Sequence, residues 1–96
     1  MIREQVVAQV RQTALNLGAA ATGTEWHLFG SVERDEEDAE DIDLMILCAS
    51  DDQADSLRRS IDPDALVLPL HASFLTFAEA AQLDAVRVQQ SSVIYP

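Results

Sequence analysis

Residues 28–47 read Leu-Phe-Gly-Ser-Val-Glu-Arg-Asp-Glu-Glu-Asp-Ala-Glu-Asp-Ile-Asp-Leu-Met-Ile-Leu, and this stretch decides the fold. A Gly-Ser pair at positions 30 and 31 follows one apolar run, and an Asp-Ile-Asp triplet at positions 41–43 opens another. Because side chains along a strand alternate between its two faces, Asp41 and Asp43 point the same way. Two carboxylates on one face of a strand can share a divalent cation.

The length and composition indicate a single domain over residues 1–96. With 48% hydrophobic residues, the chain can bury one core but not two. No apolar run approaches the roughly 20 residues that cross a bilayer, and the start of the chain lacks the apolar segment of a signal peptide. Cys48 is the single cysteine and is expected to be a small core residue. These features favour a cytoplasmic protein that does not enter the membrane.

The charge is strongly acidic. Seventeen acidic residues face six arginines and no lysine, which gives a formal net charge of −11. Such a surface repels phosphate backbones, so direct binding of nucleic acid is disfavoured. A basic partner, or metal ions that neutralise an acidic site, would suit this charge better.

Hydrophobic spacing along the chain predicts an alternation of helices and strands. We expect helices over residues 2–17, 50–60 and 77–86, and strands over residues 25–29, 41–48, 65–75 and 91–95. Ser50 is expected to cap the second helix, and Thr76 with Glu79 forms a capping box for the third. Pro69 within the third strand predicts an edge position or a bulge. Residues 19–24 and the highly charged residues 33–40 are expected to be solvated loops.

This element order predicts an α/β (α+β) fold: a mixed sheet of about four strands with helices packed mainly on one face. The apolar character of both faces beyond Asp43 places the strand over residues 41–48 in the middle of that sheet.

The residue types between positions 30 and 43 suit the binding of a nucleoside triphosphate. Gly30 would let a phosphate approach the backbone, and Ser31 offers an amide and a hydroxyl. Arg34 can donate two hydrogen bonds to a phosphate. Asp41 and Asp43 supply the hard oxygen ligands that Mg²⁺ or Mn²⁺ prefers.

These residues resemble the signature of the DNA polymerase beta-like nucleotidyltransferase superfamily, most closely its minimal members. Those members include antitoxins paired with helical toxins of the HEPN class. The resemblance implies that Gly30 and Ser31 hold the triphosphate of ATP or another nucleoside triphosphate. It also implies that Asp41 and Asp43 bind two Mg²⁺ ions and that a nucleotidyl group passes to an acceptor such as a protein hydroxyl.

The chain departs from the family pattern at three places. Asp35 and Glu40 replace a glycine and a small hydroxyl residue, and both add negative charge beside the site. Residues 66–76 contain no carboxylate, although active members carry a third one on this strand. His71 could act there as a general base or a weaker metal ligand, and Ser73 shares its face in a regular strand.

Two functions therefore remain open. The first is a nucleotidyltransferase in which Asp41, Asp43 and His71 are catalytic, and Gly30, Ser31 and Arg34 bind the nucleotide. The second is a related binding module without catalysis, such as an antitoxin that masks a partner.

Each candidate residue also has a plain structural interpretation. The two aspartates can be a solvated strand entry, Gly30-Ser31 a simple turn, and Arg34 an ion-pair partner of a nearby acid. His71 can be a polar residue without a role, and His27 is expected to be a packing or surface residue. A chain this short encloses an acceptor poorly, which favours a partner chain or a second copy that completes the site.

Overall fold

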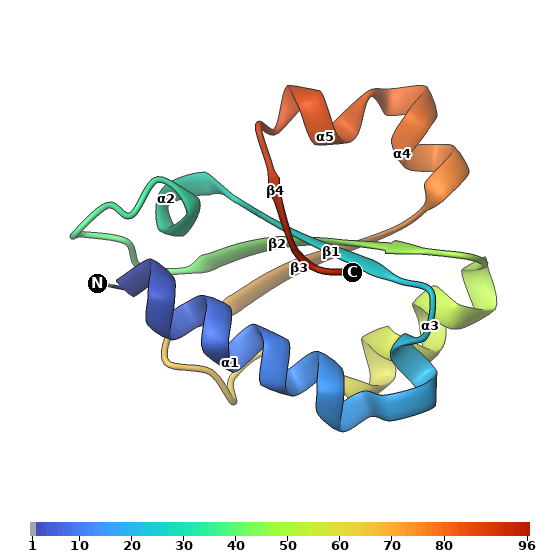
Figure 1. Cartoon of the computed structure of the whole chain (residues 1–96), viewed down its shortest axis with the longest axis horizontal. Coiled ribbons are helices and arrows are strands. Elements are labelled where there is room, and N and C mark those ends of the chain that lie inside the picture. The colour runs from blue at the N-terminus through green and yellow to red at the C-terminus, as the bar shows by residue number, and fades with distance from the viewer. Residues whose placement is uncertain (1) are drawn as a thin grey trace.

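Four strands of this chain form one mixed sheet in the order β3-β2-β1-β4 in a computed structural model that describes residues 2–96 (Figure 1). The strands are β1 (Glu25–Phe29), β2 (Ile42–Cys48), β3 (Leu70–Thr76) and β4 (Ser92–Tyr95). The helices are α1 (Ile2–Leu17), α2 (Gly30–Glu33), α3 (Asp51–Ser60), α4 (Phe77–Leu83) and α5 (Ala85–Val88), with a 3-10 turn over Gly18–Ala21. The fold class expected from the sequence is confirmed.

The sheet is mixed because β2 pairs with β1 antiparallel and with β3 parallel. β4 then pairs with β1 antiparallel, through a bulge beside Trp26. β2 is therefore central and β3 lies at an edge, as the sequence predicted. The third strand begins at Leu70, so the expected start at residue 65 is wrong: Pro69 stands just outside the ladder, and its carbonyl accepts a hydrogen bond from the Ile42 amide at 2.8 Å.

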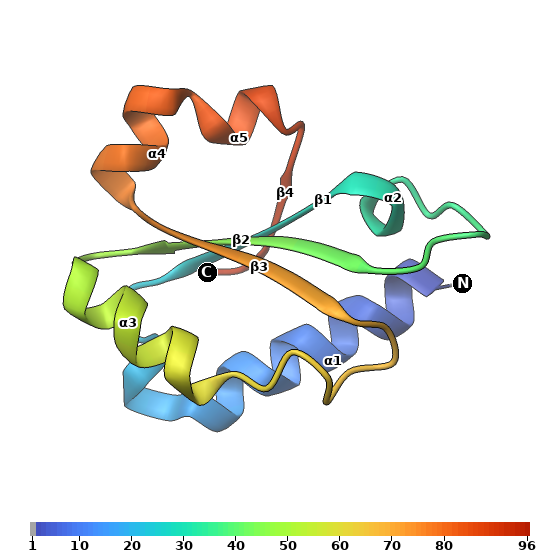
Figure 2. The same ribbon diagram turned by 180° about the vertical axis from the view of Figure 1, so that it is seen from behind.

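Helices cover the two faces of the sheet unequally. The long helices α1 and α3 lie on one face, and the short helices α4 and α5 lie over part of the other, as the two opposite views agree (Figures 1 and 2). The larger core forms under α1 and α3, where alternate β2 residues, Ile42, Leu44, Ile46 and Cys48, are fully buried. Met45 and Leu47 face the other way and pack on Ala80 and Ala85.

The helix termini follow local sequence signals in two cases and depart from them in a third. Ser50 accepts a hydrogen bond from the Gln53 amide, and Thr76 and Glu79 form the reciprocal capping box. The expected helix over residues 77–86 is instead broken at Asp84, which adopts a left-handed conformation with φ of 52°. The break turns α5 back across the sheet and leads the chain into β4. Within residues 2–96, no helix is long and apolar enough to cross a membrane.

Candidate functional site

The register of the sheet brings the predicted site residues into one row. Asp43 on β2 lies opposite Phe29 on β1 and opposite His71 on β3. Met45 and Ser73 form the next pair on the same face. This face is the one opposite the larger core, and α4 and α5 pack over its Met45 and Leu47 end, with Phe29 and Leu75 packed against the same cluster. The sheet therefore leaves Asp43 and His71 accessible beside each other.

Gly30 is required by the position of Asp43. Gly30 has φ of +75°, a conformation that side chains with a Cβ rarely adopt. A Cβ atom on Gly30 would lie 2.3 Å from Asp43 Oδ2, well inside van der Waals contact. The Gly-Ser pattern predicts a phosphate in the space beside Gly30, but the Asp43 carboxylate occupies this space. The Gly-Ser turn and the Asp-Ile-Asp strand are thus packed directly against each other.

The two aspartates and His71 form a small charged cluster. Asp41 Oδ2 lies 3.7 Å from His71 Nε2, and both side chains are well exposed. Asp43 is half-buried, and desolvation together with the nearby Asp41 carboxylate raises its pKa. His71 and Arg34 oppose this by lowering the pKa of Asp43. The charged form of Asp43 is therefore held in a site that disfavours it.

A substitution of Asp43 by asparagine should stabilise the fold at neutral pH. The pKa of Asp43 is higher in the folded than in the unfolded state, so ionisation of Asp43 destabilises the fold. This destabilisation is fully present at a pH above the folded-state pKa and is absent at a pH below the unfolded-state pKa. The Asp43→Asn variant should therefore melt at a higher temperature than the wild type at neutral pH. The difference should vanish as the pH falls below the ordinary range of aspartate, near 4. Thermal melts in EDTA across this pH range measure it, and a lower melting temperature at neutral pH would show that the charged carboxylate stabilises the fold.

Arg34 and Ser31 are placed less directly. The guanidinium of Arg34 pairs with Glu36 at 2.5 Å, in an exposed position, while its charge still reaches Asp43. Ser31 is half-buried within α2, and its carbonyl accepts a hydrogen bond from the Glu36 amide at 3.0 Å. The acidic connector (residues 33–40) thus folds back on the Gly-Ser turn. It keeps Arg34 near the site, but the guanidinium faces Glu36.

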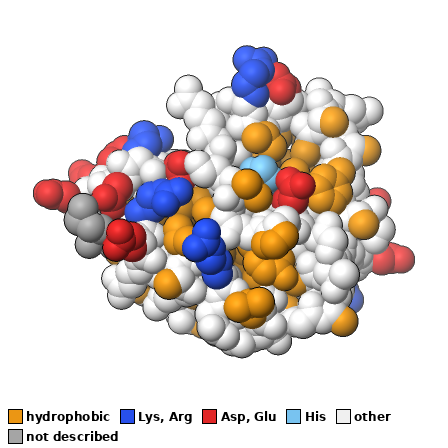
Figure 3. Space-filling view, in the orientation of Figure 1, with side chains coloured by type: hydrophobic (Ala, Val, Ile, Leu, Met, Phe, Trp, Pro, Cys, Tyr) orange, Lys and Arg blue, Asp and Glu red, His pale blue; other side chains and the backbone are white. Residues whose placement is uncertain are grey.

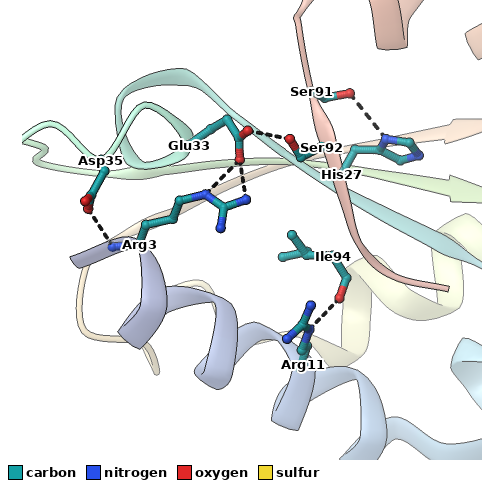
Figure 4. Close-up of polar contacts among 8 residues, drawn as sticks. All are labelled: Arg3, Arg11, His27, Glu33, Asp35, Ser91, Ser92 and Ile94. Carbon is teal, nitrogen blue, oxygen red and sulfur yellow. Dashed lines mark hydrogen bonds and ion pairs between the residues drawn. The ribbon is translucent and has the colours of Figure 1, made fainter. Parts of the chain in front are cut away.

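A polar network that the sequence analysis missed anchors α2. Arg3 on α1 donates from Nε and Nη2 to Glu33 Oε1, at 3.1 and 2.9 Å, and the Ser92 hydroxyl of β4 donates to Glu33 Oε2 (Figure 4). The Arg3 amide also donates to Asp35 at 3.1 Å. Glu33 therefore ties the Gly-Ser turn to both ends of the chain. No local signal marks this network, because Arg3 and Ser92 lie far from Glu33 in the sequence.

The carboxylate pair fits a hard divalent cation. The Asp41 and Asp43 carboxylates repel each other, and this repulsion contributes to the raised pKa of Asp43. A cation bound between them would remove the repulsion. Mg²⁺ is often held by only one or two carboxylates, with phosphate oxygens and waters as its other ligands. Over residues 2–96, however, no three His, Cys, Asp or Glu side chains are arranged to hold a metal by themselves. The donor set fits a cation that arrives with a polyphosphate better than a permanently bound one.

Comparisons of this chain with protein-family models, with curated proteins and with solved structures found no match.

Proposed function

We propose that this chain is a nucleotidyltransferase-fold protein that binds a nucleoside triphosphate with Mg²⁺ or Mn²⁺ and transfers a nucleotidyl group. The acceptor in this proposal is a hydroxyl, such as one on a partner protein. The lone buried Cys48 and the need for nucleoside triphosphates favour a cytoplasmic location. The resemblance to minimal nucleotidyltransferases is part of the proposal.

One observation carries it: Gly30, Asp43 and His71 meet at one place although they come from three elements. Gly30 has no Cβ where the Asp43 carboxylate sits, and His71 is the register partner of Asp43. Asp41 completes the group through its 3.7 Å contact with His71. A solvated strand entry would require neither the tight packing on Gly30 nor the facing imidazole.

Each residue has a distinct task in this proposal. Asp41 and Asp43 would hold the cation, which supplies neutralisation of the phosphate charge that develops during transfer. Ser31 would bind the triphosphate through its hydroxyl. His71, in its neutral form, would accept the proton of the attacking hydroxyl. Arg34 would add positive charge after leaving its exposed pair with Glu36, a pair that costs little to break.

A second candidate function is a binding module without catalysis, such as an antitoxin that masks a helical toxin. One observation favours this alternative: on β3, the residue opposite Asp43 is His71, where active nucleotidyltransferases are expected to carry a third carboxylate. In this alternative the acidic surface recruits a partner of opposite charge. The two proposals differ in whether the chain binds a nucleotide at all.

Calorimetric titration with ATP in excess Mg²⁺ tests the leading proposal. Wild-type protein should bind with measurable heat, and chelation of the cation should abolish it. Asp41→Asn and Asp43→Asn should each weaken binding by about 10-fold or more, because each removes a charged ligand of the cation.

Glu37→Gln is the matched control. Glu37 lies exposed on the same connector, and its substitution changes the net charge by the same amount. It should leave the affinity within about twofold, since an exposed charge away from the site is screened. Absence of heat with wild-type protein at millimolar ATP, or equal losses in all three variants, would overturn the nucleotide proposal.

A further inference from the structure

A second polar cluster, outside the acidic site, joins a serine, a histidine and a glutamate in series. Ser91 Oγ lies 3.2 Å from His27 Nδ1, and Glu25 Oε1 lies 3.0 Å from His27 Nε2 (Figure 4 shows the Ser91–His27 contact). His27 is only 5% exposed, whereas the Glu25 side chain is 44% exposed and Ser91 is half-buried. The sequence suggested a packing role for His27, and its burial agrees with that, but its two ring nitrogens are both engaged.

The carboxylate determines which ring nitrogen is basic. A carboxylate can only accept a hydrogen bond, so in a neutral imidazole Nε2 carries the hydrogen that faces Glu25. Nδ1 is then unprotonated and faces the Ser91 hydroxyl. The other acceptor near this hydroxyl, the Val86 carbonyl, is farther away at 3.4 Å. The arrangement orients His27 to take the proton of Ser91.

The backbone fixes Ser91 in this place. α5 ends in a Schellman motif: the Ser91 amide donates to the Val86 carbonyl at 3.2 Å, and the Gln90 amide donates to the Arg87 carbonyl at 3.1 Å. Gln90 takes the left-handed conformation that this motif requires, with φ of 52°. Ser91 is thereby held at the junction of α5 and β4, over His27 on β1.

A mostly apolar hollow lies near the cluster. It measures about 230 Å³ and is lined by Leu47, by residues of α4 and α5 that include Val86, and by one carboxylate, Asp84. Ser91, His27 and Glu25 do not themselves line it. Leu47 is the register partner of Glu25, and Val86 is the residue that Ser91 contacts. Val93, the register partner of His27, is 56% exposed and adds apolar surface beside His27. Figure 3 shows hydrophobic side chains gathered around a histidine on this face.

We propose that Ser91 is a nucleophilic serine, activated by His27 and oriented through Glu25, that accepts an acyl group from a neutral ester. The apolar hollow suits a short acyl chain. The net charge of −11 and the Glu25 carboxylate disfavour an anionic phosphate at this place. The proposal requires neither a nucleotide nor a cation and stands independently of the acidic site.

The step can be written for p-nitrophenyl butyrate. Ser91 Oγ forms a bond to the carbonyl carbon while its proton passes to His27 Nδ1. The tetrahedral adduct then collapses, the bond to p-nitrophenolate breaks, and butyryl-Ser91 remains. The imidazolium returns its proton to the departing phenolate or to solvent. In a second step, His27 Nδ1 takes a proton from water as the water oxygen attacks the new ester, and butyrate leaves while that proton passes to Ser91 Oγ.

Incubation of the whole chain with p-nitrophenyl butyrate, followed by intact-mass and peptide analysis, tests this inference. We expect one butyryl adduct per chain, located on Ser91, and none in Ser91→Ala. Glu25→Gln should slow acylation by about 10-fold, because the amide orients His27 less well and does not stabilise the imidazolium.

Ser60→Ala is the control, because among residues 2–96 the Ser60 hydroxyl bonds only the Ser56 carbonyl and should react no faster than a free serine. This variant should acylate like the wild type. An unmodified wild-type chain, an adduct on other residues only, or an equal rate in Ser91→Ala would overturn the proposal. Peptide mapping of the wild type keeps the test decisive even where a variant folds poorly.

Discussion

Replacement of Gly30 by alanine is expected to lower the free energy of unfolding by about 3 kcal/mol. Two costs add in this variant. A residue with a Cβ at φ of +75° loses about 1–2 kcal/mol to backbone strain. The new methyl group would also stand 2.3 Å from Asp43 Oδ2, so either the carboxylate or the Gly-Ser turn must move. Affinity for ATP with Mg²⁺ should fall with it, because the displaced carboxylate is a proposed ligand.

Gly23→Ala separates these two costs. Gly23 has φ of +78°, close to that of Gly30, but a Cβ there would meet nothing within 4 Å. This control should lose only the backbone-strain cost of about 1–2 kcal/mol and bind nucleotide normally. Urea denaturation of the wild type and both variants gives the free energies. Equal losses at the two positions would show that Asp43 does not pack on Gly30 as described.

Replacement of Leu44 by alanine should destabilise the fold by about 2–5 kcal/mol. Leu44 is fully buried at the centre of β2, within the core that α1 and α3 cover. Its truncation removes apolar burial and leaves a cavity that the flanking strands cannot fill without moving. For a domain of this size, a loss of this magnitude corresponds to a fall in melting temperature of roughly 8–40 °C.

Leu83→Ala tests the same chemical change on the surface. Leu83 ends α4 and is 64% exposed, so its truncation should alter the free energy of unfolding by about 0.5 kcal/mol or less. Thermal melts followed by circular dichroism compare the two variants. Similar melting temperatures for the two variants would contradict the burial of Leu44 in the larger core, and with it the assignment of alternate β2 side chains to the two faces of the sheet.

Features set by short-range chemistry could be predicted from the sequence. Ser50 and Thr76 cap their helices because each hydroxyl reaches an amide three residues away, which a sequence pattern shows directly. The alternation of β2 was also predicted, since Ile42 and Asp43 differ so strongly in polarity. The sequence also shows that the Gly-Ser turn and the two aspartates lie close together along the chain. It does not show that Gly30 packs against the Asp43 carboxylate.

Features set by distant contacts could not be predicted. Residues 65–69 are apolar, a composition that predicts a strand. In the structure they form an irregular segment from which Leu66 and Leu68 pack on the core. The strand begins only after Pro69. The break at Asp84 carries no glycine or proline to mark it.

The pairing of His71 with Asp43 depends on the register of two parallel strands joined by a long crossover. The contact between His27 and Ser91 spans 64 residues. In both cases the site follows from tertiary structure and not from a local motif.

Paramagnetic mapping of the cation site tests the central claim most directly. Mn²⁺ broadens the amide signals of residues close to it, so substoichiometric Mn²⁺ with excess ATP should broaden a defined set in the NMR spectrum. The account predicts that this set comprises Gly30, Ser31, Asp41, Asp43 and His71. Broadening confined to the acidic connector over residues 33–40, or no selective broadening with ATP present, would contradict a nucleotide-bearing cation at Asp41 and Asp43.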